Sequence, residues 1–212
     1  MTVEKRANPD RLYRVARWGV TQLARGLLRM RVIGADQVPD EGPVIVAANH
    51  ASYFDIPLLG ISLARQADYL AKRELFALPL VGALLRMLGG VPVKRGGVDR
   101  AAMTEVARRL AAGRLLVIYP EGTRSRTGIL GPPRPGIGWI VAESKAQVVP
   151  VFIRGTRGLR PFGEVTLCFG EPLDFGPELA RSAQMRSKKL YARIALRVMA
   201  EIEKLGQRRL SS

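Results

Sequence analysis

The sequence of 212 residues predicts an α/β fold: a mainly parallel, twisted sheet flanked by helices, with an amphipathic helix at the N-terminus and another helix at the C-terminus. The main observation is alternation, because short apolar runs of strand length are separated by longer segments with helical periodicity. Strands that alternate with helices form parallel sheets that are covered on both faces. The run LLVIYP at residues 115–120 is the plainest buried strand.

The expected strands are short runs bounded by Gly, Pro or polar residues. They cover residues 43–49, 67–72, 89–95, 115–120, 147–153 and 165–170. The expected helices lie between these strands and at both ends of the chain. They cover residues 11–30, 56–65, 75–87, 98–113, 137–145 and 177–205. Ligands of such sheets bind at the carboxyl ends of the strands, so the residues that follow each strand are the first candidates for a site.

The N-terminal helix over residues 11–30 is amphipathic. Its apolar face is expected to hold Leu12, Val15, Ala16, Val20, Leu23, Leu27 and Met30. Its opposite face holds Trp18 among Arg11, Arg14, Arg25 and Arg29. Two interpretations stay open: a helix packed on the body of the protein, with Trp18 along arginine stems, or an interfacial helix whose Trp and Arg side chains meet anionic lipid headgroups.

The composition is that of a globular chain with an unusual charge. It has 34 Lys and Arg against 18 Asp and Glu, a net charge of +16. Such a surface attracts polyanions: nucleic acid, an anionic membrane or acidic proteins. Aromatic residues make up only 6%, and no RNP-type aromatic strand or zinc-ligand spacing occurs, which weakens the nucleic-acid interpretation.

Compartment and membrane topology are constrained by a few residues. Cys168 is the only cysteine, which excludes an internal disulfide and fits a reducing compartment. The most apolar stretch, residues 75–93, is interrupted by Arg86, by prolines and by glycines, so it does not predict a membrane-spanning helix. The N-terminus lacks the apolar region of a signal peptide. We therefore expect a protein that stays inside the cell.

One candidate site follows the strand at residues 43–49, in the run NHASYFD. It contains His50, the only histidine, and Asp55. With His50 in the loop and Asp55 at the start of the next helix, the carboxylate can fold back onto the imidazole. A carboxylate on one ring nitrogen sets the tautomer and leaves the other nitrogen as a base. Two plainer interpretations remain: Asp55 only caps the helix, and His50 is an ordinary surface or core residue.

A second candidate site follows the strand at residues 115–120, in the run YPEGTRS of residues 119–125. A turn with exposed backbone N–H groups beside a guanidinium suits a phosphate monoester, because Arg donates two parallel hydrogen bonds to phosphate oxygens. The plainer interpretation is a hydrophilic loop with a solvated arginine.

These two segments, with two more, resemble the motifs of the glycerolipid acyltransferase family, in particular bacterial 1-acyl-sn-glycerol-3-phosphate (lysophosphatidate) acyltransferases. The family's N-H-x-x-x-x-D motif is matched at Asn49, His50 and Asp55, and its [F/Y]-P-E-G-T-R-S motif at residues 119–125. A glycine-led strand that ends in Arg95 is matched loosely, with Pro92 in place of a larger residue. The Val-Pro-Val strand lies at residues 149–151, and the four motifs occur in the family's order.

The resemblance covers about residues 32–172 and implies the reaction. An acyl group would pass from an acyl thioester, acyl-CoA or acyl carrier protein, to the sn-2 hydroxyl of lysophosphatidate, giving phosphatidic acid. His50 would be the general base, oriented by Asp55. Attack would be direct, because Cys168 lies in a late strand and is expected to pack as a small apolar residue.

The resemblance also implies substrate-binding residues. They are Lys72, Arg95, Glu121, Gly122, Thr123 and Arg124. Among them Lys72, Arg95 and Arg124 are candidates for the acceptor's phosphate, and the Gly122 N–H is a candidate for the developing oxyanion. The apolar residues 75–88 offer a surface for the acyl chain, or are an ordinary buried helix.

No metal and no cofactor beyond the acyl donor is expected. Residues 1–31 are expected to be a basic, amphipathic membrane-docking segment, and residues 32–212 the acyltransferase domain. The charge would hold the protein peripherally on the anionic cytoplasmic face of the cell membrane, and would also attract acidic acyl carrier protein or the phosphates of coenzyme A.

Two alternatives stay open. The nearest is an acyltransferase of the same chemistry that uses another lysolipid or an aminolipid as acceptor. The other is a non-catalytic basic protein that binds membranes or nucleic acid.

Overall fold

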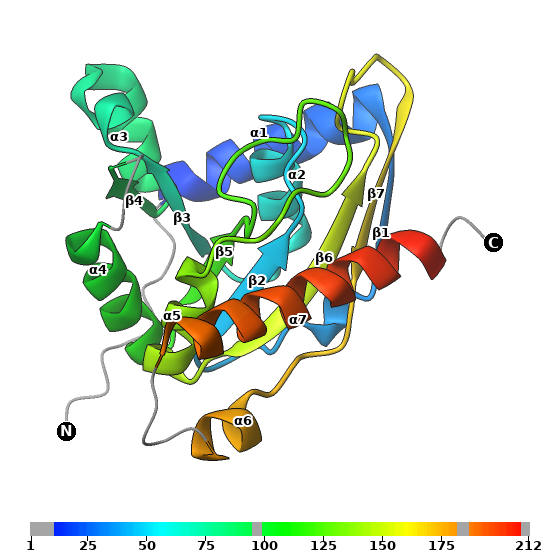
Figure 1. Cartoon of the computed structure of the whole chain (residues 1–212). Helices are drawn as coiled ribbons and strands as arrows, with labels where there is room; N and C mark the ends of the chain where they lie inside the picture. Colours follow the sequence, from blue (N-terminus) through cyan, green and yellow to red (C-terminus); the bar gives the residue numbers. More distant parts are fainter. Residues whose placement is uncertain (1–10, 95–98, 182–186, 209–212) are drawn as a thin grey trace.

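The computed structural model describes residues 11–94, 99–181 and 187–208, and its centre is a single seven-stranded sheet (Figure 1). The strand order across the sheet is β1-β7-β6-β2-β5-β3-β4. The strands are β1 (Leu28–Ile33), β2 (Val44–Ala48), β3 (Ala67–Lys72), β4 (Gly90–Val93), β5 (Leu115–Ile118), β6 (Gln147–Arg154) and β7 (Gly163–Phe169).

The sheet is mostly parallel, as the sequence predicts. Strands β2 to β6 all run in one direction, whereas β7 is antiparallel to β6 and β1 pairs in parallel with β7. The middle of the sheet is β2, which lies between β5 and β6. Loops that follow β2, β5 and β6 therefore emerge side by side at one edge.

Helices cover both faces of the sheet, and they complete the expected fold class. The α-helices are α1 (Arg11–Leu27), α2 (Asp55–Ser62), α3 (Pro79–Met87), α4 (Arg100–Ala111), α5 (Gly136–Ser144), α6 (Gly176–Arg181) and α7 (Lys188–Arg208). Two short 3-10 helices, η1 (Ala35–Gln37) and η2 (Arg73–Ala77), lie in the connections. The long C-terminal helix α7 lies across one face of the sheet (Figure 1).

The core has two halves because side chains alternate along each strand. In β2, Ile45 and Ala47 face α4, α5 and α7, whereas Val44 and Val46 face α2 and the end of α1. All five β2 side chains are buried, as expected for a central strand of a covered parallel sheet. This burial makes β2 a rigid base for the loop that follows it.

Two predicted helices differ clearly from those of the structure, and a third, over residues 75–87, begins only at Pro79 because residues 73–77 form the 3-10 helix η2. The first helix ends at Leu27, not at residue 30, and residues 28–33 form edge strand β1, because they pair with β7. The predicted helix of residues 177–205 is two helices, α6 and α7. The first difference arises because the pairing with β7, a tertiary contact, overrides a weak local propensity for helix. Residues 182–186, between α6 and α7, lie outside the described residues.

Helix α1 packs on α2 through a face that its apolar periodicity did not indicate. Tyr13 and Ala24 are buried, and the Arg17 guanidinium donates to the carbonyls of Ile61 and Leu63. The predicted apolar face instead remains largely in solvent: Leu12, Val15, Leu23 and Leu27 are exposed. Trp18, on the predicted cationic face, is exposed as well. The helix thus touches the body and still presents an uncovered apolar face.

Helix α3 is not an ordinary buried helix. Leu80 is 88% exposed, and Leu78, Val81 and Leu84 are exposed too. Gly82 is its only buried residue, because a side chain there would collide with the backbone of Phe76. Within the part of the chain that the structure describes, no helix is both long and apolar enough to cross a bilayer.

Candidate active site

The site lies where the central strands end, and Asn49 joins two of them. Its side-chain amide donates to the carbonyl of Ile153 at 2.9 Å and accepts from the N–H of the same residue at 2.7 Å. This two-way contact continues the β2–β6 pairing one residue beyond Ala48. The backbone that carries His50 is therefore held to the neighbouring strand.

His50 and Asp55 form the pair that the sequence predicts. His50 Nδ1 lies 2.8 Å from Asp55 Oδ2, and both residues are buried. The same oxygen accepts from the backbone N–H groups of Ala51 and Ser52, at 2.7 and 2.8 Å. The interpretation of Asp55 as a helix cap alone is wrong, since its carboxylate folds back onto the loop before α2 and onto the imidazole.

The Asp55 carboxylate is kept ionised by its contacts. Burial by itself raises the pKa of Asp55, but the contact with His50, the nearby Thr156 hydroxyl and the hydrogen bonds from the N–H groups of Ser52 and Ala51 outweigh burial and hold that pKa below its ordinary value. An anionic carboxylate at Nδ1 leaves Nε2 as the basic nitrogen of His50. Nε2 makes no hydrogen bond to any residue that the structure describes.

The His50 ring also has a stacking partner that the sequence analysis missed. The Tyr119 ring lies parallel to it, with centroids 4.0 Å apart and planes 18° apart. Tyr119 stands at the end of β5, two residues before Glu121 in the YPEGTRS run. The adjacency of β2 and β5 could have indicated the contact, but strand order is not readable from one sequence.

Glu121 joins the loop after β2 to two parts of the loop after β5. Its Oε1 accepts from the N–H of His50 at 2.9 Å, and its Oε2 accepts from the N–H of Gly131 at 2.9 Å. The N–H of Ser125 in turn donates to the His50 carbonyl at 2.7 Å. The loop after β5 is therefore bonded to both backbone polar groups of His50, and Glu121 shapes the site through the backbone.

Gly122 has a positive φ of 68°, which suits glycine. A side chain there would collide with Arg134, whose aliphatic stem lies over this residue. The Gly122 N–H donates to the Tyr119 carbonyl at 2.9 Å, so in this structure it is engaged within the turn and not turned toward an oxyanion. Its role is to close the turn.

Three guanidinium groups surround a cavity of about 460 Å³ next to the loop that carries His50. It is lined by Ala51, Thr123, Arg124, Ser125, Arg126 and Arg157. The Arg124 guanidinium lies over the Tyr53 ring, 3.5 Å from its centroid, and Arg157 Nη1 donates to the Thr127 carbonyl at 2.8 Å. Sequence reasoning found Arg124 but not Arg126 and Arg157, which come from the loops after β5 and β6.

These three arginines have no acidic partner among the described residues, and no carboxylate lines their cavity. Like charges that are held together repel one another, so an anion bound between them is favoured. The cavity has the charge and the donors to bind a phosphate.

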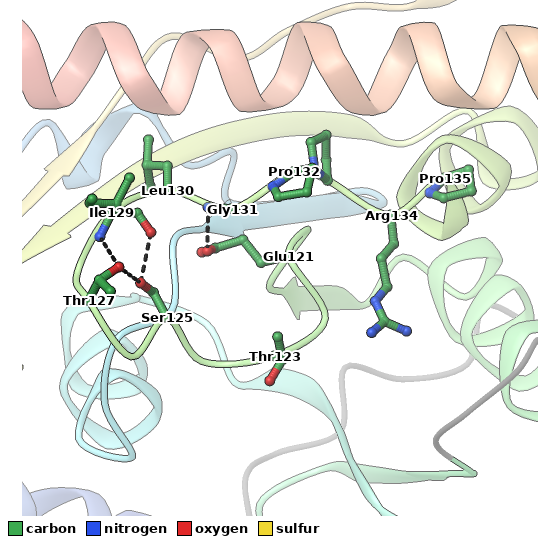
Figure 2. Close-up of a pocket in the computed structure, with 11 residues that line it drawn as sticks. Glu121, Thr123, Ser125, Thr127, Ile129, Leu130, Gly131, Pro132, Arg134 and Pro135 are labelled. Carbon is green, nitrogen blue, oxygen red and sulfur yellow. Dashed lines mark hydrogen bonds between the residues drawn. The ribbon is translucent and has the colours of Figure 1, made fainter.

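A larger cavity of about 610 Å³ lies along the loop of residues 121–135 (Figure 2). Its walls include Ile129, Leu130 and three prolines, and Glu121 and Thr123 also line it. In Figure 2, Arg134 and Thr123 extend to the same side of this loop, and Glu121 points back to Gly131. The two cavities share Thr123 and Ser125, so they are continuous around this turn.

Lys72, another predicted phosphate ligand, does not line either cavity. Lys72 ends β3, is exposed, and has its Nζ 3.9 Å from Glu74 Oε2. Arg95 lies outside the described residues. Within the described ranges, no three His, Cys, Asp or Glu side chains gather as metal ligands. Cys168 is buried in β7, as expected.

Comparisons with known proteins agree with this geometry. The family model described as Acyltransferase matches residues 29–154, more than half of the chain. The 1-acyl-sn-glycerol-3-phosphate acyltransferase of Bacillus subtilis is 29% identical over 183 residues, which cover 84% of this chain and 85% of that protein. The crystal structure of the 1-acyl-sn-glycerophosphate (LPA) acyltransferase PlsC from Thermotoga maritima has a TM-score of 0.67 at 27% identity, covering 93% of this chain and 84% of that one.

Other relatives match over a shorter part. The chloroplastic 1-acyl-sn-glycerol-3-phosphate acyltransferase BAT2 of Brassica napus is 33% identical over 135 residues, 61% of this chain and 38% of the plant protein. The lyso-ornithine lipid O-acyltransferase of Pseudomonas aeruginosa is 39% identical over 112 residues, 52% of this chain and 42% of that protein. The chain thus spans about two fifths of the length of these relatives. Its motifs, its fold and the family match agree: the chain belongs to the acyltransferase family.

Proposed function

We propose that the protein transfers an acyl group from an acyl thioester to the sn-2 hydroxyl of 1-acyl-sn-glycerol-3-phosphate, which gives phosphatidic acid. The observation that carries this proposal is the juxtaposition of the His50–Asp55 pair with a cavity lined by three guanidinium groups that have no acidic partner among the described residues. The names of the relatives in Bacillus subtilis and Thermotoga maritima support the same acceptor.

The chemistry needs only a base and a positioned acceptor. His50 Nε2 takes the proton of the acceptor hydroxyl as its oxygen attacks the thioester carbonyl, and Asp55 stabilises the imidazolium that forms. The C–O bond forms and the C–S bond breaks. The thiolate then leaves and collects the proton from His50. A thiol with a pKa of about 8.5 is a good leaving group, so no further acid is needed.

The arginine cavity is suited to the acceptor's phosphate. A phosphate monoester carries close to two negative charges at neutral pH and three acceptor oxygens. Arg124 is held by its stacking on Tyr53, and Arg157 by its bond to the Thr127 carbonyl, so part of the ordering cost is met before binding. Thr123 adds a hydroxyl to the same wall. Lys72, at the end of β3, and Arg95, which lies outside the described residues, stay as proposed contributors.

A second acceptor class is an aminolipid. The relative from Pseudomonas aeruginosa named lyso-ornithine lipid O-acyltransferase supports it, at 39% identity. The cavity favours the phosphate acceptor over this one, because an ammonium group among Arg124, Arg126 and Arg157 is repelled and finds no carboxylate in the lining.

We also propose that the protein docks peripherally on an anionic membrane, through residues 1–31 and helix α3. The exposed Leu12, Val15 and Trp18 of α1 and the exposed Leu80 of α3 support this, together with the net charge of +16. Apolar side chains that enter the headgroup region and cations that meet anionic lipids add to one another. Acidic acyl carrier protein remains a possible donor on the same electrostatic argument.

The test is thiol release from acyl-CoA, with and without lysophosphatidate, together with detection of phosphatidic acid. Wild type is expected to release thiol in proportion to product, and His50→Ala is expected to lose at least a hundredfold in rate. Gln207→Ala, an exposed change on α7, serves as the control for mutation itself.

The other outcomes of this assay distinguish the alternative acceptors, donors and reactions. Release without lysophosphatidate but with a lyso-ornithine lipid supports the aminolipid alternative. Release with no acceptor indicates a thioesterase. If acyl-CoA is inert, acyl carrier protein is tried as donor, and inactivity with both donors contradicts the proposal.

A further inference from the structure

The Asp55 carboxylate is bonded on one side only. Its Oδ2 accepts three hydrogen bonds, from the His50 ring and from the N–H groups of Ala51 and Ser52. Its Oδ1 is fully buried, and no described residue makes a hydrogen bond of standard geometry to it. A buried oxygen of an ionised carboxylate without a donor is costly, so a donor for Oδ1 is expected close by.

Thr156 supplies the candidate donor. Its side chain is buried, with 1% of its surface exposed, and within the described residues its hydroxyl has no hydrogen-bond partner of standard geometry. This hydroxyl interacts with the Asp55 carboxylate and stabilises the charged form. Two neighbouring buried groups, one an acceptor and one a rotatable donor, satisfy each other.

The path of the chain after β6 explains why Thr156 lies there. Asn49 holds Ile153 beside the loop that carries His50 through two hydrogen bonds. Gly155 then turns the chain with φ of 88°, at a point where a side chain would collide with the carbonyl of Glu164. Because the turn is tight and glycine allows it, the next residue faces back into the site.

We propose that Thr156 is a positioning residue, whose hydroxyl donates to Asp55 Oδ1 and so orients Oδ2 toward His50 Nδ1. A carboxylate held at only one oxygen can pivot about that oxygen. A donor at Oδ1 removes this freedom and fixes the direction of the lone pair that meets the imidazole. Because Thr156 is buried beneath the site, it acts through Asp55. The catalytic consequence rests on the function proposed above.

The central comparison is Thr156→Val, which keeps the shape and removes the donor, with Thr156→Ser, which keeps the donor. Thr166→Val, the same change in a half-buried position of β7, is the matched control. In Thr156→Val we expect kcat to fall about tenfold with KM unchanged for acceptor and donor. The acid limb of the pH–rate profile is expected to move to higher pH, because the charged carboxylate has lost a donor. Thr156→Ser and Thr166→Val are expected to behave like wild type.

A second measurement does not depend on activity. His50 is the only histidine in the chain, so its ring resonances in NMR spectra are unambiguous. The Nδ1–H signal of wild type and Thr156→Ser is expected to shift or broaden in Thr156→Val, while circular dichroism shows that all variants are folded. If no variant and no wild-type sample transfers acyl groups, the proposed function fails, and this signal still tests the positioning role.

Several results would overturn the inference. One is a Thr156→Val variant with wild-type kcat, pH profile and His50 signal. Another is a Thr156→Ser variant as impaired as Thr156→Val, since the retained hydroxyl would then not support the activity. A third is an equal loss in Thr166→Val, which would indicate a general effect of changing this layer of the core.

Discussion

The aromatic ring of Tyr119 lies flat against the imidazole of His50, with ring centroids 4.0 Å apart. Asp55 holds one edge of the imidazole through Nδ1, and Tyr119 holds its face. Together these contacts leave Nε2 as the unbonded edge of the ring. A base held in one plane loses less entropy when the substrate arrives.

Stacking and the phenol hydroxyl of Tyr119 can be separated by mutation. The hydroxyl is buried, has no hydrogen-bond partner among the described residues, and has a pKa raised well above its ordinary value by burial. Tyr119→Phe removes the unpaired group and keeps the ring, so we expect activity near wild type and a melting temperature that is equal or higher. Tyr119→Leu removes the stacking and is expected to lower kcat about tenfold. Thermal unfolding curves and steady-state rates measure these two effects. Equal activity of Tyr119→Phe and Tyr119→Leu would contradict a role for the ring.

Glu121 holds the His50 N–H and the Gly131 N–H, so its substitution is expected to loosen the loops after β2 and β5. Glu121→Gln offers one acceptor in place of two, so either the His50 N–H or the Gly131 N–H is left unpaired and buried. We expect a loss of about 1–3 kcal/mol in unfolding free energy and a lower kcat. Chemical denaturation measures the first quantity, with Glu171→Gln, an exposed change, as control. A variant as stable as wild type would show that these two hydrogen bonds contribute little.

The arginine cavity predicts a charge-specific effect on the acceptor. Arg157→Gln and Arg126→Gln are expected to raise the KM for lysophosphatidate by about tenfold, because each removes one cation from the phosphate, and to leave the KM for acyl-CoA unchanged. Arg160→Gln, an exposed change close in sequence that does not line the cavity, is the control. Steady-state kinetics with both substrates varied is the measurement. An equal rise in the KM for lysophosphatidate and the KM for acyl-CoA would contradict a specific role of these arginines in binding the acceptor's phosphate.

Stability is expected to fall in acid. Hydrogen bonds from Arg108 and Arg109 lower the pKa of Glu105 to about 2, and the hydrogen bonds to Asp55 outweigh its burial and lower its pKa below the ordinary value. A carboxyl whose pKa is lower in the folded state stabilises the protein above its unfolded pKa, and this contribution is lost as pH falls through the folded value. The melting temperature should therefore be level above about pH 5 and fall from about pH 4 downward. Glu105→Gln should flatten part of this fall, whereas an unchanged slope would show that Glu105 does not contribute.

Local sequence determined the elements and the identity of the pair at the site. Apolar runs of strand length between helical segments indicated the mostly parallel sheet, because burial on both faces requires continuous Val, Ile and Leu. The spacing of His50 and Asp55 allowed the pair, since a loop before a helix lets a residue five positions later fold back, and the resemblance to the acyltransferase motifs favoured it over a helix cap. Arg124 was found for a similar reason, because it follows a strand end in the same motif as Glu121.

Only the tertiary structure decided which distant residues complete the site. Tyr119 meets His50 because β5 lies beside β2, and Thr156 and Arg157 arrive because β6 lies on the other side. Strand order depends on the packing of the whole sheet, and the hydrophobic periodicity of a segment does not indicate which strands lie beside it. For the same reason residues 28–33 became an edge strand on β7, and the leucines of α3 stayed in solvent. Local pattern sets the preference of each segment, whereas the neighbours it meets in the folded chain determine its final environment.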